Sequence, residues 1–337
     1  MKSGLRRIRI AVSAFSVLIC LIFSACSCGV LQSLIKSGDA PVFYDCFSVN
    51  FLDVGEGDAI FINFNDGKTM LIDCGEKDEK NLKTIERYLN AYSGGTLDYL
   101  ILTHPDSDHV GNAAYILEKY AVKTAFVPYL SKPEEFCGYY EAYALIEEKG
   151  IGKISEAGTM ITGEDYYAVF LSPNALGITD SAYDEAIASE MLSADDINAL
   201  SPIIYLEYKC VRFVFTGDAG FSQEKVALYN CETGIIKQRL INAGKEDLRL
   251  EDLDFLKVSH HGANDACGRD FLNALKPKNA VISVGGNNYG HPKSETLFRI
   301  KDANENCNIY LTSEYGTVSV LVDDSGGITL KTDASAA

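Results

Sequence analysis

Three apolar runs near the start of the folded region alternate with short polar turns. The runs are "FYDCFSVNFLDV", "AIFINF" and "KTMLIDCG", and the turns between them are "GEGD" and "NDGK". Short runs rich in Phe, Ile and Val predict β-strands, and an Asn-Asp-Gly turn between two of them is typical of a hairpin. We therefore expect a group of paired strands over residues 43–75.

After this group the pattern changes to helices that alternate with strands. Leu82, Ile85 and Leu89 recur at helical spacing and predict a helix over residues 79–92. The remaining elements follow from the same reasoning. Helices are expected at 109–120, 141–149, 221–230, 269–275 and 294–302, strands at 97–103, 123–128, 253–259 and 279–285, and hairpins at 202–218 and 308–321.

This order of elements predicts an α/β fold in which sheets are covered by helices on both outer faces. The regular pattern is lost between residues 172 and 200, which indicates an inserted acidic loop or lid. Because no segment has the composition of an interdomain linker, we expect a single domain over residues 42–337.

The first 25 residues form a separate segment. Four basic residues in "MKSGLRRIRI" precede an apolar stretch of the length typical of an export signal. The stretch ends in "FSAC", which resembles a bacterial lipoprotein cleavage site at Cys26, although Phe23 stands where such sites usually have Leu. The alternative is an uncleaved anchor helix. Both predict a domain at the outer face of the cytoplasmic membrane, tethered by its N-terminus, with residues 26–41 as a linker.

Composition restricts the classes of function. The formal net charge is −17, which does not favour general affinity for nucleic acid but leaves room for a metal that neutralises phosphate. The ten cysteines show no CxxC pair and no regular spacing, so neither a disulfide framework nor a cysteine zinc site is indicated. No protein partner is evident from the sequence.

All five histidines follow predicted strands and lie near glycine. The segment "LTHPDSDHVGN" places His104, Asp106, Asp108 and His109 within six positions, directly after an apolar run. Turn chemistry explains each residue singly but not the four together. Similar strand-end positions hold Asp73, Asp218, His260, His261, Asn288 and His291. Histidine nitrogens and carboxylate oxygens are ligands for a catalytic divalent metal, so the pattern predicts a metal centre.

The segment "THPDSDHVGN" resembles the HxHxDH signature of the metallo-β-lactamase superfamily, in an HxDxDH variant. "NFLDVGEGDAIFI", "LIDCG", "DDINALSPIIYLEY", "FTGD", "KVSHHGA" and "NNYGHP" follow the order seen in the hydrolase domain of ComEC-type competence proteins, across residues 46–322. The resemblance implies an αββα four-layer sandwich with one or two divalent ions, Zn²⁺ or Mn²⁺, at one edge of the sheets.

The resemblance also implies roles for individual residues. His104 and Asp106 would bind the first metal, Asp108 and His109 the second, and Asp218 would bridge them. One histidine of "SHHG" would complete the second site, and we favour His260, with His261 behind it. Asp73 would orient a ligand histidine or cap a turn. Further expectations are catalytic roles for Asp108, His261 and His291, His291 being a general acid or phosphate donor, and a substrate-binding role for Asn288.

Two departures from the family pattern bear on the first metal. Asp106 stands where the superfamily has a second histidine, and residues 110–217 contain no histidine that could be a third. We therefore expect a weak first site, or one completed by water or by an acid from the 172–200 loop. Carboxylate in place of imidazole favours harder ions such as Mn²⁺.

Three functions remain open from the sequence. The first is a metal-dependent hydrolase that uses a metal-activated water on a phosphodiester such as single-stranded DNA. Lys257 and Lys293 are candidates for positive charge near the phosphate. The second is another exported metallo-hydrolase, acting on a phosphorylcholine ester or a small ester or lactam. The third is a surface module that binds metal without turnover.

Overall fold

The computed structural model describes residues 44–92, 94–130, 132–174, 193–232, 234–245, 248–286 and 289–333. The expected export signal, Cys26, the linker, Asn288 and most of the 172–200 segment lie outside these ranges. None of the helices within them is long and apolar enough to cross a membrane. The cysteines that the ranges include are all unpaired thiols.

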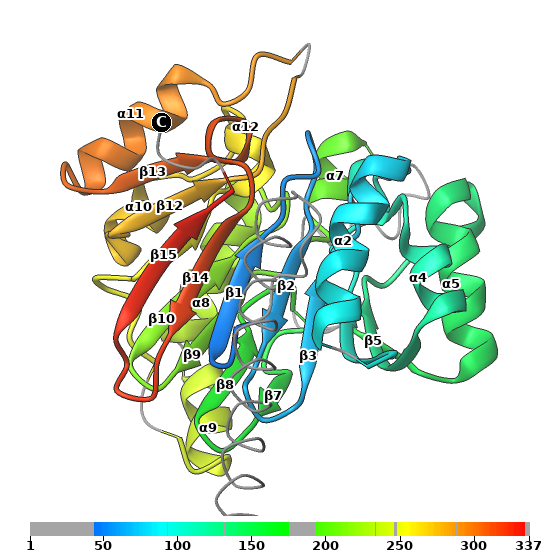
Figure 1. Cartoon of the computed structure of the whole chain (residues 1–337). Helices are drawn as coiled ribbons and strands as arrows, with labels where there is room; N and C mark the ends of the chain where they lie inside the picture. The colour runs from blue at the N-terminus through cyan, green and yellow to red at the C-terminus, as the bar shows by residue number, and fades with distance from the viewer. Residues whose placement is uncertain are drawn as a thin grey trace, which may run out of the picture. The chain divides into compact units, whose positions relative to one another are not determined.

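Two mixed sheets form the centre of the domain (Figure 1). The first has the order β15 (Ile328–Thr332), β14 (Val318–Val322), β1 (Phe47–Phe51), β2 (Ile60–Asn63), β3 (Thr69–Ile72), β4 (Thr96–Ile101), β5 (Ala121–Val127) and β6 (Gly152–Ile154). The second has the order β13 (Asn308–Leu311), β12 (Asn279–Ile282), β11 (Phe255–Lys257), β10 (Val211–Phe215), β9 (Ile204–Tyr208), β8 (Tyr166–Phe170) and β7 (Met160–Thr162).

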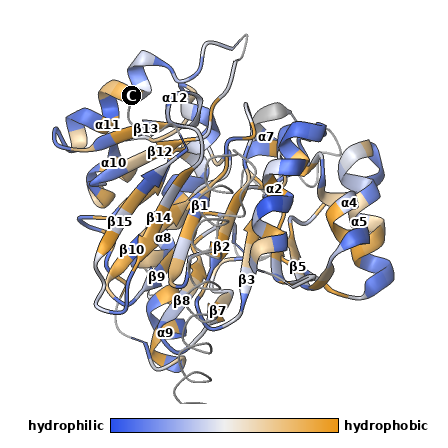
Figure 2. Ribbon diagram, in the orientation of Figure 1, coloured by the Kyte–Doolittle hydropathy of each residue, from blue (hydrophilic) through white to orange (hydrophobic). Residues whose placement is uncertain are grey.

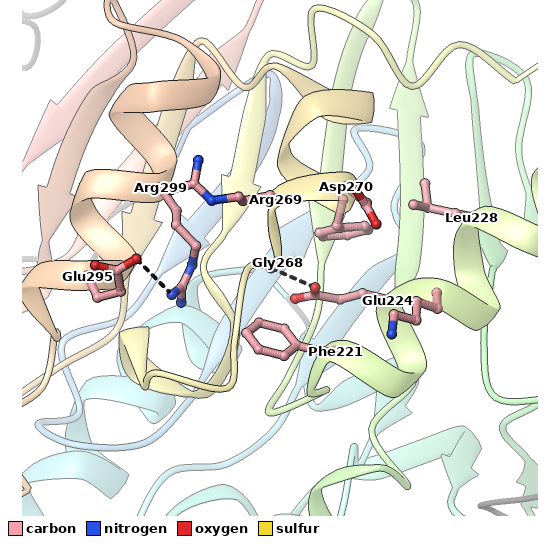
Figure 3. Close-up of a pocket in the computed structure, with 10 residues that line it drawn as sticks. Phe221, Glu224, Leu228, Gly268, Arg269, Asp270, Glu295 and Arg299 are labelled. Atoms are coloured by element: carbon pink, nitrogen blue, oxygen red, sulfur yellow. Dashed lines mark hydrogen bonds and ion pairs between the residues drawn. The ribbon is translucent and has the colours of Figure 1, made fainter.

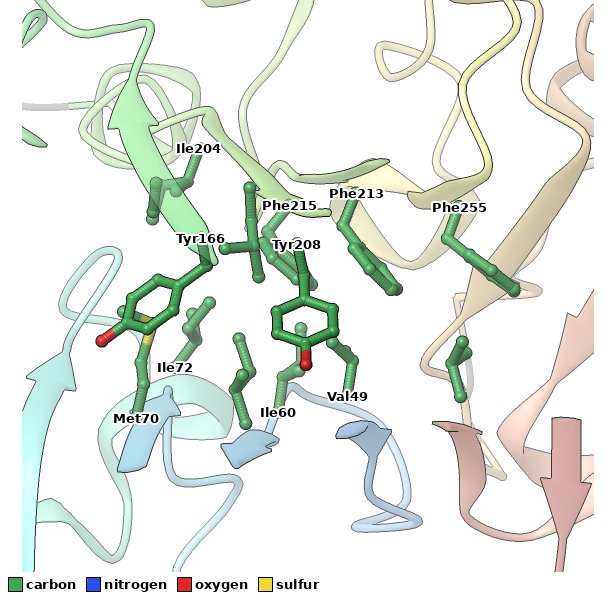
Figure 4. Close-up of a cluster of buried hydrophobic side chains, with 14 of the residues drawn as sticks. Val49, Ile60, Met70, Ile72, Tyr166, Ile204, Tyr208, Phe213, Phe215 and Phe255 are labelled. Atoms are coloured by element: carbon green, nitrogen blue, oxygen red, sulfur yellow. The ribbon is translucent and has the colours of Figure 1, made fainter. Parts of the chain in front are cut away.

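The sheets pack face to face through side chains selected by strand alternation. In β10, Phe213 and Phe215 join the core between the sheets, whereas Val214 between them faces the helices. Aromatic rings make up much of this core, among them Tyr208, Phe213 and Phe255 (Figure 4). Phe47 stacks on Tyr208 with ring centroids 4.1 Å apart. The apolar strand interiors are evident in Figure 2, where the central strands are mostly orange.

Helices cover the outer face of each sheet, which gives the predicted αββα sandwich. The second sheet packs against apolar side chains of α8 (Phe221–Glu232), α9 (Ile235–Asn242), α10 (Arg269–Leu275) and α11 (Ser294–Ala303). On the first sheet lie α2 (Glu79–Tyr92), α4 (Ala113–Lys119) and α5 (Cys137–Lys149). Short turns of helix, α3 (Ser107–Val110), α7 (Ala194–Asn198) and α12 (Thr312–Tyr315), lie in connections.

Most local predictions hold, and the failures concern one long-range pairing and several elements that the sequence pattern did not reveal. Helices 79–92 and 269–275 are confirmed at both ends, as is the hairpin at the Asn-Asp-Gly turn. The predicted hairpin at 308–321 is wrong, because β13 pairs with β12 in one sheet while β14 pairs with β1 and β15 in the other. The predicted helix 109–120 is divided into α3 and α4. Elements that were not predicted are β6, β7, β8, α9 and β15.

The parallel strands of both sheets point toward the edge that carries the candidate site. β3, β4 and β5 are parallel in the first sheet, as are β10, β11, β12 and β13 in the second. The loops after β3 and β4 hold Asp73 and His104, and those after β10 and β11 hold Asp218 and His261. Loops from both sheets therefore contribute polar side chains to one site.

We predict that Phe213→Ala lowers the free energy of unfolding by about 3–5 kcal/mol, because the side chain is fully buried between the sheets and its removal leaves a cavity. Phe298→Ala is the matched control, since that ring is 56% exposed on α11. Its effect should stay within about 0.5 kcal/mol. Urea denaturation of the two variants measures the difference, and equal losses would contradict the assigned core.

Candidate metal centre

The carboxylate of Asp218 lies at the centre of the site, within 3.9 Å of four imidazole nitrogens. Its Oδ1 is 3.3 Å from Nε2 of His109. Its Oδ2 is 3.5 Å from Nε2 of His261 and 3.9 Å from Nε2 of both His104 and His260. Asp218 therefore brings together histidines that follow strands of two different sheets.

Two further aspartates flank this carboxylate. Oδ2 of Asp106 is 3.6 Å from Nε2 of His104. Oδ2 of Asp108 is 3.8 Å from Nε2 of His109 and 3.5 Å from Nε2 of His261. The contacts define two groups that share Asp218. One comprises His104, Asp106 and Asp218, and the other comprises Asp108, His109, His261 and Asp218.

Asp73 lies behind the cluster and orients two of its histidines. Nδ1 of His109 donates to Oδ2 of Asp73 at 2.8 Å, because a carboxylate can only accept. The Thr103 hydroxyl donates to the same oxygen at 2.7 Å and accepts from Nδ1 of His104 at 3.0 Å. One fully buried carboxylate thus holds both rings with Nε2 toward Asp218.

Adjacent His260 and His261 differ in burial and in the acceptor of Nδ1. The His261 side chain is 3% exposed, and its Nδ1 donates to the Ser283 carbonyl at 2.7 Å. The His260 side chain is 25% exposed, and its Nδ1 lies 3.2 Å from Asp265. Our preference for His260 as the ligand of the second site is not supported, because Nε2 of His261 is the one beside both Asp108 and Asp218.

The donor atoms fit a divalent metal ion. Nε2 of His104, His109 and His261 and Oδ1 of Asp218 are buried and have no hydrogen-bond partner. Leaving such groups unpaired is costly, whereas a metal would satisfy all of them. Two ligand atoms of one tetrahedral zinc lie roughly 3.3 Å apart. Neighbouring donor atoms here lie 3.3–3.9 Å apart, so small movements would close them on an ion.

The electrostatics of the cluster are those of closely coupled opposite charges. Burial alone would lower the pKa of His109, but Asp218, Asp108 and Asp73 outweigh it and hold that pKa well above its ordinary value. For His261 the balance between burial and the Asp218 charge raises the pKa to about 10. Burial opposes ionisation of Asp218, yet His109 and His261 hold its pKa well below the usual range. Positive charge in this site therefore stabilises the ionised carboxylates, and protons or metal ions can supply that charge.

The comparison with known proteins agrees with this geometry. The sequence profile described as the metallo-beta-lactamase superfamily matches residues 52–177, which include the His104–His109 motif. Residues 52–177, a little more than a third of the chain, are therefore similar in sequence to the metallo-beta-lactamase superfamily. The matched range includes the segment from Asp73 to His109, whereas Asp218 and His261 lie beyond it.

Two curated proteins are similar to most of the chain. ComE operon protein 3 of Bacillus subtilis (strain 168) is 27% identical over 82% of this chain and 33% of its own length. Recombination protein 2 of Haemophilus influenzae is 27% identical over 77% of this chain and 27% of its own length. The chain therefore spans about a third or less of the relatives that it matches.

The solved structures that match this chain are more distant in sequence. The metallo-beta-lactamase fold protein YhfI from Bacillus subtilis is 10% identical, with a TM-score of 0.46 over 81% of this chain and 99% of that one. CmlA, a diiron beta-hydroxylase from Streptomyces venezuelae, is 11% identical, with a TM-score of 0.48 over 83% of this chain and 55% of that one.

An open pocket of about 600 Å³ leads to the candidate metal centre. His291 lines it with its ring centroid 5.7 Å from that of His260, and its Nδ1 donates to Glu56 at 3.2 Å. Burial lowers the pKa of His291, and the neighbouring His260 and His261 lower it further, against the opposing charge of Glu56. Tyr289 stacks beside His291 with ring centroids 5.7 Å apart and is 70% exposed at the rim.

A buried ion pair beneath the centre joins the two sheets. Nζ of Lys257 on β11 lies 2.7 Å from Asp58, which precedes β2, and both side chains are almost inaccessible. Lys257 is therefore a buried structural cation and is not exposed to solvent. Next to Asp58, a side chain on Gly57 would lie 2.2 Å from the carbonyl oxygen of Asp108, so glycine allows this loop to approach the ligand-bearing segment.

Several residues that shape the site were not predicted from the sequence. Glu56 and Asp58 lie in "VGEGD", a glycine-rich strand end like the predicted ones, so their position could have identified them. Asp265 follows "SHHG" closely in sequence. Asn198, whose amide nitrogen is 3.5 Å from Nε2 of His260, comes from the 172–200 segment, where the sequence led us to expect an acid or water.

We predict that Asp73→Asn weakens binding of both metal ions by about 10- to 100-fold, because an amide nitrogen would face the two donors that Oδ2 now accepts. Thr103→Val is the comparison variant. It breaks the link to His104 but leaves His109 bound to Asp73, so it should weaken one ion only. Calorimetric titration of the metal-free proteins measures both affinities. Unchanged affinities in Asp73→Asn would show that Asp73 serves only the local turn.

Proposed function

We propose that this protein is a metal-dependent hydrolase of phosphodiesters. The observation that carries the proposal is the pair of ligand groups that share Asp218 at the base of an open pocket, beside the Glu56–His291 pair. His104, Asp106, Asp108, His109, His261 and Asp218 would hold one or two divalent ions. Such ions supply a water activated as nucleophile and positive charge for the phosphate oxygens.

The residues around the ions have separate tasks. Nδ1 of His291 holds a proton toward Glu56, and Oε2 of Glu56 accepts from the Gly285 amide at 3.1 Å. The Glu56 carboxylate is thereby fixed and orients the His291 ring. His291 is then the residue that can exchange a proton with the substrate, and Glu56 is its positioning residue. Asp108, His109 and His261 hold the nucleophile side of the pocket.

The pocket lining explains why an anionic substrate would depend on bound metal. Glu56, Glu76 and Asp78 line it together with the aspartates of the centre. Among the described residues of its wall, Lys80 is the one lysine or arginine. Without metal this surface repels phosphate, and with metal the aspartates of the centre are offset. Removal of the metal should therefore weaken binding of the anionic substrate.

A single-stranded nucleic acid is the substrate class that the rim favours. The exposed Tyr289 ring provides a flat surface next to the centre, and aromatic rings of this kind stack on bases irrespective of sequence. The name of the Haemophilus relative refers to recombination, which agrees with a nucleic acid. The acidic residues Glu76 and Asp78 favour a second candidate, a phosphodiester with a cationic group such as phosphorylcholine, which Tyr289 could also bind.

The metal and the location are part of the same proposal. Asp106 and Asp108 make the centre rich in carboxylate, which supports Mn²⁺ as well as Zn²⁺. The basic and apolar N-terminal segment with Cys26 supports export and a lipid tether at the outer face of the cytoplasmic membrane.

We predict that Asp108→Ala lowers phosphodiesterase turnover by more than about 100-fold, because it removes a ligand of the second group. Removing a residue that only hydrogen-bonds to a ligand costs up to roughly 100-fold, and loss of the ligand itself should cost more. Asp302→Ala on α11, away from the pocket, should leave turnover unchanged. A panel of single-stranded DNA, bis-p-nitrophenyl phosphate, p-nitrophenylphosphorylcholine and nitrocefin identifies the ester class. Hydrolysis of nitrocefin alone would refute the proposal, as would full activity of Asp108→Ala.

We predict that Tyr289→Ala raises KM for a single-stranded oligonucleotide by about 5- to 150-fold, the range expected for loss of one stacked base. Tyr289→Phe should behave as wild type because it keeps the ring. An oligonucleotide of abasic units is the control substrate and should be insensitive to both variants. Equal KM increases on the two oligonucleotides would exclude base stacking. An increase of KM in Tyr289→Ala for p-nitrophenylphosphorylcholine alone would favour the second candidate.

A further inference from the structure

The two adjacent histidines of "SHHG" approach the same oxygen from different directions. Both have left-handed backbone conformations, with φ of 47° at His260 and 51° at His261. Their rings are splayed at 71°, with centroids 6.4 Å apart. Yet Nε2 of each is directed at Oδ2 of Asp218, at 3.9 Å and 3.5 Å. Such strained positions in consecutive residues are kept where a particular placement of both side chains is needed.

The first ligand group has a deficit that His260 can fill. That group has a single histidine, His104, with Asp106 and the shared Asp218. Nε2 of His260 is as far from Oδ2 of Asp218 as Nε2 of His104 is, 3.9 Å in each case. We propose that His260 is a ligand of the first ion and His261 a ligand of the second. This inference rests on the proposed function, which requires bound metal.

His260 has the support that a ligand histidine needs. Asp265 accepts from its Nδ1 at 3.2 Å, which leaves Nε2 for a metal, as the Ser283 carbonyl does for His261. Asp265 is fixed in turn, since its carbonyl accepts from the amide of Phe221 at the start of α8. Each of the two histidines therefore has an oxygen acceptor at Nδ1 and keeps Nε2 available for a metal.

The loop that carries Asp265 is clamped by a buried acid and a buried base (Figure 3). The Glu224 carboxylate accepts from the amides of Cys267 and Gly268 at 2.6 Å and 2.7 Å. Arg299 donates to three carbonyls of the same loop, at 2.8–3.1 Å. These belong to Asn264, Ala266 and Cys267. Both donors and acceptors of the loop are thus occupied, which holds Asp265 and, through it, His260 in place.

Asn198 is the competing candidate for the first ion. Its Oδ1 is buried and has no hydrogen-bond partner, and its Nδ2 lies 3.5 Å from Nε2 of His260. A contact of that length is at the outer limit of a hydrogen bond and leaves the His260 nitrogen available. If His260 is the ligand, its replacement weakens the first ion and replacement of Asn198 does not. If Asn198 is the ligand, the reverse holds.

The test is calorimetric titration of the metal-free full chain with Zn²⁺. We expect two ions per wild-type chain. His260→Ala should weaken one of them by more than 100-fold, whereas Asn198→Ala should leave both unchanged. Asp265→Asn keeps the imidazole but loosens it, and should weaken the same ion by about 10- to 100-fold. Circular dichroism of the metal-free variants checks the fold, which should tolerate a change at the partly exposed His260.

A spectroscopic variant tests coordination directly and without turnover. In His260→Cys loaded with Co²⁺, a thiolate ligand would give a near-ultraviolet charge-transfer band that the wild type, with its other cysteines, does not show. A band with the intensity expected for one thiolate ligand per chain supports the proposal. Two tight ions in His260→Ala, no new band in His260→Cys, or loss of an ion in Asn198→Ala alone would each overturn it. Two bound ions without phosphodiesterase activity would instead refute the proposed function.

Discussion

The shared carboxylate of Asp218 is the interaction on which the site depends. Four imidazole nitrogens surround it within 3.9 Å, and it is almost completely buried. A buried carboxylate is costly unless positive charge and hydrogen bonds compensate it. The surrounding structure delivers histidines from both sheets to this one point, and each Nε2 is directed inward because an oxygen holds the ring from behind.

Because the ligands come from both sheets, the centre depends on how the sheets pack. The aromatic core between them sets the distance between β4 and β10, and so between His104 and Asp218. The buried Lys257–Asp58 pair links the sheets again directly beneath the ligands. Removing one partner of such a pair leaves an uncompensated buried charge. The metal-binding geometry and the stability of the sandwich are therefore coupled.

Local patterns carried much of the fold prediction, since helical spacing at Leu82, Ile85 and Leu89 decides α2 without reference to distant residues. The pairing of β14 with β1 joins residues more than 250 positions apart, and no local signal distinguishes it from a hairpin with β13. For the site, the position after a strand predicted His104, His109 and Asp218 as ligands, and the structure brings these three side chains together. The choice between His260 and His261 depends on two left-handed backbone conformations. The roles of Glu56 and Asp265 depend on which loops meet in the folded chain. Neither can be read from the spacing of residues along the sequence.

The most direct test of the account is a crystal structure of the protein with Mn²⁺, with anomalous scattering used to locate the metal. The account predicts two peaks, each coordinated by Asp218, with His261 on one and His104 on the other. A single peak bound without Asp218, or no peak at saturating metal, would contradict the shared carboxylate as the centre of the site.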